Sequence, residues 1–136
     1  MPLLAAINGA KGFIGYQYDC VVPYVDDRWP GHSAEEWPKV VAMSRLLNEL
    51  GPFIIGPAGA PEVTVECTVP GEVQARAFLD GKGGIRVLIV GMGSKCEAKV
   101  TVSGYPALSS QFGSTKNLGN GVYLFQADVI DSDVLK

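Results

Sequence analysis

The pattern of apolar and polar positions changes along the chain. Residues 12–19 form a nearly continuous apolar run after a glycine turn, which is typical of a parallel strand buried on both faces. Residues 34–50 repeat apolar side chains at steps of three and four, which predicts an amphipathic helix. From residue 62 onward apolar and polar positions alternate between turn residues, which predicts short antiparallel strands. The pattern therefore predicts an α+β protein.

The predicted helix at 34–50 has a start signal and a stop signal. Ser33 and Glu36 have the spacing of a capping box, and Pro38 is tolerated while it lies in the first turn. The Gly-Pro pair at 51–52 is expected to end the helix. One apolar stripe is expected to pack on another part of the protein. Its members are Val40, Val41, Met43, Leu46, Leu47 and Leu50. An earlier helical segment, residues 3–8, is expected to end at Gly9.

The second half of the chain begins after a linker, Pro-Ala-Gly-Ala-Pro, at residues 57–61. It predicts strands at 62–69, 73–80, 85–90, 97–102 and 122–129. The glycine-rich residues 80–84 predict a hairpin, and residues 119–121 predict a second turn. The last predicted strand is expected to bury the alternate side chains Tyr123, Phe125, Ala127 and Val129. Short strands with turns at these intervals predict a small antiparallel β-sandwich.

Composition limits the classes of function. The chain has 136 residues, 47% of them hydrophobic, and a net charge of -3, as expected of a folded soluble protein. Without a basic stripe we expect no nucleic-acid partner, and without a long apolar run or a signal peptide we expect no membrane association. The localisation beyond this is undetermined. Cys20, Cys67 and Cys96 fit neither a disulfide framework nor a metal site and are expected to be buried free thiols.

Both halves of the chain resemble parts of one enzyme architecture. Residues 5–16, Ala-Ala-Ile-Asn-Gly-Ala-Lys-Gly-Phe-Ile-Gly-Tyr, resemble the segment that enters the eighth strand of (β/α)8-barrel glycoside hydrolases, and residues 37–52 resemble the eighth helix. The apolar strand and Asp-Gly turn at 77–81, followed by 86–90, are similar to the small β-sandwich that follows the barrel in many of these enzymes. The resemblance implies a terminal β/α unit of a TIM-type barrel in residues 1–56 and a sandwich domain in residues 62–136.

The resemblance implies that the catalytic carboxylates lie outside this sequence. In these hydrolases they stand at the ends of the fourth and seventh strands, both of which would precede Met1. Asp26 and Asp27 are expected to be solvated in a loop, and Glu35 and Glu36 are explained by the positive end of a helix. We therefore expect no catalytic residue in this chain, which alone lacks a recognisable carboxylate pair for hydrolysis.

What remains of a site is the rim of the substrate cleft. Residues at the carboxyl end of a barrel strand face the cleft. The substrate-rim candidates are therefore Gln17, Tyr18, Asp19, Tyr24 and Trp29. Aromatic rings offer flat faces to a pyranose, whereas the carboxylate and amide can bind hydroxyl groups. Alternatively, Tyr18 and Trp29 pack beneath the loop.

No cofactor and no metal is expected. His32 lies beside the predicted helix cap, and Trp37 is expected to pack in the core or at the helix start. Asp128, Asp131 and Asp133 do not have the spacing of an EF-hand loop and are interpreted as an acidic surface at the end of a strand.

Three functional hypotheses follow. The first is the C-terminal portion of a carbohydrate-active glycoside hydrolase acting on glucan-type or xylan-type polysaccharides. Its sandwich would be a structural accessory domain, and its partner would be the N-terminal barrel portion of the same enzyme or a second copy of the chain. The second is a non-catalytic carbohydrate-binding or interaction module, although residues 57–136 contain no Trp. The third is a self-contained α+β protein whose helix at 34–50 covers one face of the sandwich.

Overall fold

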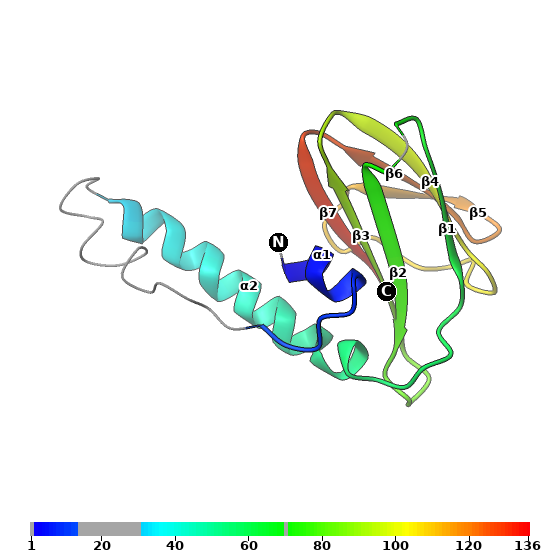
Figure 1. The fold of residues 1–136 in the computed structure, drawn as a ribbon, viewed down its shortest axis with the longest axis horizontal. Coiled ribbons are helices and arrows are strands. Elements are labelled where there is room, and N and C mark those ends of the chain that lie inside the picture. Colours follow the sequence, from blue (N-terminus) through cyan, green and yellow to red (C-terminus); the bar gives the residue numbers. More distant parts are fainter. Residues whose placement is uncertain (1, 14–30, 70) are drawn as a thin grey trace. The chain divides into compact units, whose positions relative to one another are not determined.

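The computed structural model describes residues 2–13, 31–69 and 71–136, and the chain forms two compact units. One unit combines Met1–Lys11 with Phe53–Lys136, and the other is Gly12–Pro52. The first unit contains all the strands described (Figure 1). The helices are α1 (Pro2–Ile7) and α2 (His32–Ile54), and the strands are β1 (Val63–Cys67), β2 (Val73–Leu79), β3 (Ile85–Met92), β4 (Cys96–Val102), β5 (Thr115–Gly119), β6 (Val122–Ala127) and β7 (Ile130–Leu135).

The strands form two antiparallel sheets. One sheet has the order β1-β4-β6-β5 and the other has the order β2-β3-β7. The prediction of a small antiparallel β-sandwich is therefore confirmed. Strands β5 and β7 are additions to the predicted set, and each lies at an edge of its sheet.

The sandwich core lies between the two sheets. Tyr123 and Phe125 are fully buried on β6, and Val100 and Val102 are fully buried on β4. Each side chain of this size contributes about 1.5–3 kcal/mol when it leaves water. The alternation in the sequence thus correctly predicted the inward faces of β4 and β6.

Strand β3 is buried on both faces. Val87 and Ile89 belong to the core between the sheets, whereas Leu88 and Val90 alternate with them and are also buried. Helix α1 contacts β2 and β3 and lies beside them in Figure 1. The outer face of the β2-β3-β7 sheet is therefore covered by chain that precedes the linker, which explains the continuous apolar run of β3.

Helix α1 ends as the sequence predicted. The Ala10 amide donates to the Ala5 carbonyl at 2.9 Å, and the Gly9 amide donates to the Ala6 carbonyl at 3.0 Å. This pair of bonds is a Schellman motif, which requires the left-handed backbone that Gly9 adopts at a φ of 101°.

Helix α2 is longer than predicted. It runs from His32 to Ile54, so the expected end at residues 51–52 was wrong. Pro38 and Pro52 both lie inside the helix, and Pro38 lies beyond the first turn in which it was expected. A proline in a helix loses a backbone hydrogen bond and also clashes with the Cβ of the residue before it, and Gly51 removes the second of these penalties for Pro52. The Gly-Pro pair lies in the last turn of the helix, which ends two residues after Pro52.

The apolar stripe of α2 is covered unevenly. Leu46 and Leu50 are buried, whereas Val40 is 38% exposed. Trp37 was expected to pack, but its side chain is 41% exposed. Residues 14–19 of the strand predicted at 12–19 lie outside the described residues, so the β/α unit of a barrel stays a prediction.

The turn between β5 and β6 was predicted correctly, but the end of β6 was not. Asn120 adopts a φ of 53° in the turn at residues 119–121, as expected of Asn in a tight hairpin. Strand β6 ends at Ala127, and Val129 is 59% exposed in the following turn rather than buried. The alternation continues past the last hydrogen-bonded pair, so sequence alone overestimated the length of the strand.

Candidate functional site

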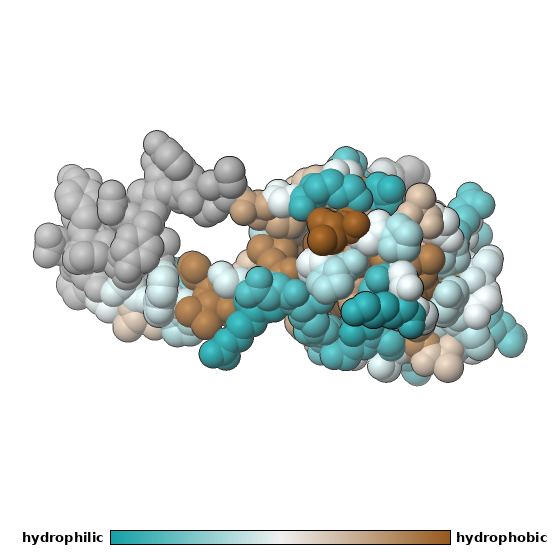
Figure 2. All heavy atoms as spheres, turned by 90° about the horizontal axis from the view of Figure 1, so that it is seen from below, coloured by the Kyte–Doolittle hydropathy of each residue, from teal (hydrophilic) through white to brown (hydrophobic). Residues whose placement is uncertain are grey.

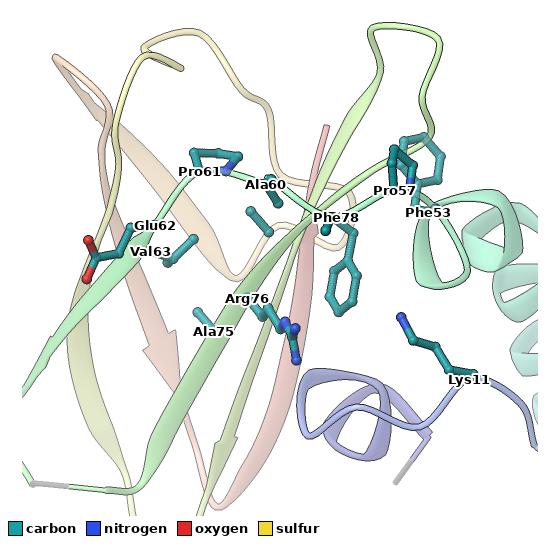
Figure 3. Close-up of a pocket in the computed structure, with 14 residues that line it drawn as sticks. Lys11, Phe53, Pro57, Ala60, Pro61, Glu62, Val63, Ala75, Arg76 and Phe78 are labelled. Carbon is teal, nitrogen blue, oxygen red and sulfur yellow. The ribbon is translucent and has the colours of Figure 1, made fainter.

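The predicted substrate-rim residues cannot be placed. Gln17, Tyr18, Asp19, Tyr24 and Trp29 all lie outside the described residues, as do Asp26 and Asp27. The candidate site is instead a groove of about 480 Å³ in the sandwich unit, shown in Figure 3. It is lined by Lys11, Phe53, residues 56–63 and residues 75–78 of β2.

Lys11 brings a positive charge to this groove. Its ammonium Nζ donates to the carbonyl oxygen of Ile54, the last residue of α2, at 2.7 Å. The last carbonyls of a helix have no partner within the helix and carry partial negative charge. Lys11 therefore caps the helix end and is held in a fixed position at one side of the groove.

Arg76 brings a second positive charge from strand β2. Its Nη1 donates to the carbonyl oxygen of Ile7, the last residue of α1, at 3.0 Å. Its guanidinium carbon lies 5.5 Å from the centre of the Phe78 ring. Arg76 thus caps the second helix end at this groove and contacts an aromatic face.

Two phenylalanines form the apolar part of the site. Phe53 and Phe78 are 8% and 7% exposed. Arg86 lies opposite Phe78 in the strand pairing, and its guanidinium carbon is 4.5 Å from the centre of the Phe53 ring. Guanidinium groups and aromatic rings therefore alternate over the outer face of the sheet.

The charge balance of the groove favours an anion. Lys11 and Arg76 line it, and Glu62 is the one acidic residue among its lining residues. In Figure 3 the Glu62 carboxylate points away from both cations. Glycoside hydrolysis requires a pair of carboxyl groups flanking the bond, so this groove is suited to binding rather than to hydrolysis.

A second hollow of about 630 Å³ is more acidic. It is lined by Thr68, Lys95, Cys96, Glu97, Gln126, Ala127, Asp128 and Asp131. Gln126 Nε2 donates to Glu97 Oε1 at 2.6 Å across β4 and β6. Among the residues that the structure describes, no group of three potential ligand side chains is placed to hold a metal ion.

The acidic residues near the C-terminus do not form one surface. Asp133 was expected at an acidic surface, but it is fully buried on β7. Its carboxylate accepts hydrogen bonds from Ser110 Oγ and from the backbone amides of Phe112 and Val134. A buried carboxylate needs such partners, and this explains an aspartate that the sequence pattern assigned to the exterior.

Two of the three cysteines can be placed. Cys96 is buried and Cys67 is half-buried, and both are free thiols, while Cys20 lies outside the described residues. Burial raises the pKa of the Cys96 thiol, and a hydrogen bond with Cys67 raises this pKa further. The prediction of a buried free thiol is therefore confirmed for Cys96.

The surface gives no broad apolar patch on the side seen in Figure 2, where strongly hydrophobic spheres are interrupted by hydrophilic ones. Within residues 2–13, 31–69 and 71–136, none of the helices has both the length and the hydropathy to cross a bilayer.

Comparison of the chain with protein-family models, curated proteins and solved structures found no match. Sequence reasoning also missed the groove, because its residues come from segments far apart in the chain. The apolar run of β3 was the one signal for this site. A strand that is apolar on both faces must be covered on its outer face as well as in the core, so another segment has to pack there. Arg86 is half-buried on β3 of that covered sheet, where a charge must find partners.

Proposed function

We propose that this chain is the C-terminal portion of a carbohydrate-active glycoside hydrolase, in which the sandwich is a structural accessory domain. The proposal rests on which segments make up the sandwich unit. This unit includes residues 1–11 as well as residues 53–136. Helix α1 packs on β2 and β3, so the sandwich is joined to the preceding chain through a packed contact as well as through the linker. A supporting domain requires such a fixed attachment.

The exposed stripe of α2 supports the same proposal. Val40 and Trp37 are more than one-third exposed, and Val41, Met43 and Leu47 are only half-buried. Burying a large apolar side chain contributes about 1.5–3 kcal/mol. In the complete enzyme, the remaining strands and helices of the barrel would cover this stripe.

The chemistry would then lie in the missing barrel portion. Its carboxylate pair would cleave the glycosidic bond of a glucan-type or xylan-type polysaccharide. In this proposal Gln17, Tyr18, Asp19, Tyr24 and Trp29 border a sugar subsite, and none of them is a catalytic residue.

The test is to express the chain together with the coding sequence immediately upstream and to compare it with the chain alone. Reducing-sugar release from soluble glucan and xylan is the measurement. We expect hydrolysis by the extended protein only, and loss of hydrolysis when a strand-end glutamate of the upstream portion is changed to glutamine. An upstream sequence without a barrel, or an extended protein that cleaves neither polymer, would overturn the proposal.

The alternative function is a non-catalytic carbohydrate-binding module, and the groove of about 480 Å³ beside Pro57 and Pro61 is the observation that favours it. Residues 71–136 show no row of exposed aromatic rings, since Tyr123 is fully buried, Tyr105 is half-buried and Phe112 is a single exposed ring. Saturable heat of binding to soluble glucan or xylan by the chain alone would support the alternative over a purely structural role.

A further inference from the structure

We propose that the groove at Lys11 and Arg76 binds the carboxylate of an acidic sugar, a uronic acid within an oligosaccharide. The choice of a sugar rests on the proposed function, whereas the choice of a carboxylate rests on the groove itself. Two fixed cations, an apolar wall and a single outward-pointing acid are the features that carry it.

The two cations are held in place before any ligand arrives. The Lys11 ammonium bonds to the Ile54 carbonyl at 2.7 Å, and the Arg76 guanidinium bonds to the Ile7 carbonyl at 3.0 Å. Each bond uses one donor, and ammonium and guanidinium groups each have several. Because the side chains are already ordered, less conformational entropy is lost when a ligand binds to them.

The shape of the groove admits more than a free ion. Its volume of about 480 Å³ lies in the range of small-molecule sites. Pro57 and Pro61 line it beside the backbone of residues 58–60, which offers apolar surface and carbonyl groups to a sugar ring. The carboxylate would bind to Arg76 and Lys11, and the ring would lie against the proline-rich wall.

The solvent exposure of both cations weakens their attraction for a carboxylate. Lys11 and Arg76 are exposed, so water and salt compete for their charges. Binding should therefore be weak, sensitive to ionic strength and dependent on the carboxylate rather than on the neutral part of the sugar.

The test is a titration of the full chain at low salt, followed by calorimetry or by amide chemical shifts. The probes are trigalacturonate, the neutral trisaccharides xylotriose and cellotriose, and inorganic phosphate. We expect trigalacturonate to bind at least about ten-fold more tightly than the other probes, a difference of about 1.4 kcal/mol. Equal binding of the neutral sugars or of phosphate, or no binding of trigalacturonate, would overturn the proposal.

Three variants distinguish binding in the groove from binding elsewhere on the surface. Arg76→Gln removes one cation, and Ala58→Asp adds an acid at an exposed lining position without touching either helix cap. We expect each to weaken trigalacturonate binding about ten-fold, whereas Lys116→Gln, an exposed lysine on β5, should leave it unchanged. An Ala58→Asp variant with an unchanged unfolding transition and unchanged binding would contradict the proposal. Failure of the hydrolysis assay on the extended protein would leave this titration unaffected, so the two proposals fail separately.

Discussion

The Ser110 hydroxyl donates to Oδ2 of Asp133 at 2.5 Å and joins the segment before β5 to the buried half of strand β7. The other carboxylate oxygen accepts from the amides of Phe112 and Val134 at 3.0 and 2.8 Å. A fully buried carboxyl group is tolerated here because hydrogen-bond donors reach it from two segments of the chain.

Ser110→Ala should therefore destabilise the protein. The variant leaves Asp133 Oδ2 without its hydroxyl donor, which costs about 1–3 kcal/mol for a buried acceptor. Urea unfolding measures the change, and Ser103→Ala, at an exposed position, is the control with an expected change within about 0.5 kcal/mol. Equal losses in both variants would show that the bond contributes nothing.

Tyr123→Phe should also lower the free energy of unfolding. The Tyr123 hydroxyl accepts from the buried Leu108 amide at 3.0 Å and donates to the Tyr105 carbonyl. Its loss leaves a backbone donor without this partner, at a cost of about 1–3 kcal/mol. Thermal and urea unfolding should show a larger loss than Tyr105→Phe, which alters a half-buried ring at the edge of the core. The reverse order would contradict the assignment.

Gly91→Ala tests the close approach of the two sheets. A Cβ at this position on β3 would lie 2.7 Å from the Ala127 Cβ and 3.1 Å from Cε1 of Phe125. Overpacking of this kind costs about 1–3 kcal/mol. The double variant Gly91→Ala with Ala127→Gly removes the closest contact and should recover part of the loss in urea unfolding. No recovery would mean that the Phe125 contact or the backbone of β3 dominates the loss.

The Asp80 carboxylate should make stability dependent on acidic pH. Its Oδ1 accepts from the amides of Lys82 and Gly84, both at 2.8 Å, and these bonds, first that from Lys82, lower its pKa. Because the pKa is lower in the folded state, the contribution is present above the unfolded pKa, about 4. It is lost as the pH falls through the folded pKa.

Asp80→Asn keeps the acceptor oxygen and removes the titration. Thermal unfolding midpoints measured from about pH 6 down to about pH 2 should fall less steeply for this variant than for the wild type. Parallel curves would show that other carboxylates account for the acid sensitivity.

Cys96 should react slowly with thiol reagents in the folded protein. Burial and the hydrogen bond with Cys67 raise its pKa, which reduces the thiolate that attacks an alkylating agent. Peptide mapping after iodoacetamide treatment at neutral pH should find Cys96 modified far more slowly in the folded chain than in urea. Comparable rates in the two conditions would show that this end of β4 opens readily.

The sequence predicted the regular parts of the sandwich and missed the irregular ones. Strands β1, β2, β3, β4 and β6 have clear alternation or a continuous apolar run, and the hairpin turns at 80–84 and 119–121 contain glycine. Strand β5 buries only Thr115, so no alternation identifies it. Strand β7 was missed because an aspartate is normally expected at the surface. Asp133 is buried because Ser110 and the Phe112 amide donate hydrogen bonds to it, and these partners are not apparent from the sequence.

The groove could not have been predicted from local pattern. Lys11 and Arg76 are 65 residues apart in sequence numbering (76 − 11 = 65), and both line one groove because Lys11 binds the Ile54 carbonyl and Arg76 binds the Ile7 carbonyl. Helix caps by distant side chains depend on tertiary structure, whereas the cap at Gly9 is local and was predicted.

The sandwich unit is formed by two segments that are separate in the sequence, and this affects how it folds during synthesis. The chain leaves the unit after Lys11 and returns at Phe53, and the bond from Lys11 to Ile54 joins the two points. During synthesis α1 emerges well before the strands that it covers, so the unit can close only after translation has passed the whole intervening segment. The entropy of closing such a loop grows slowly with its length. Closing the chain around residues 12–52 is therefore one of the entropic costs of forming the sandwich unit.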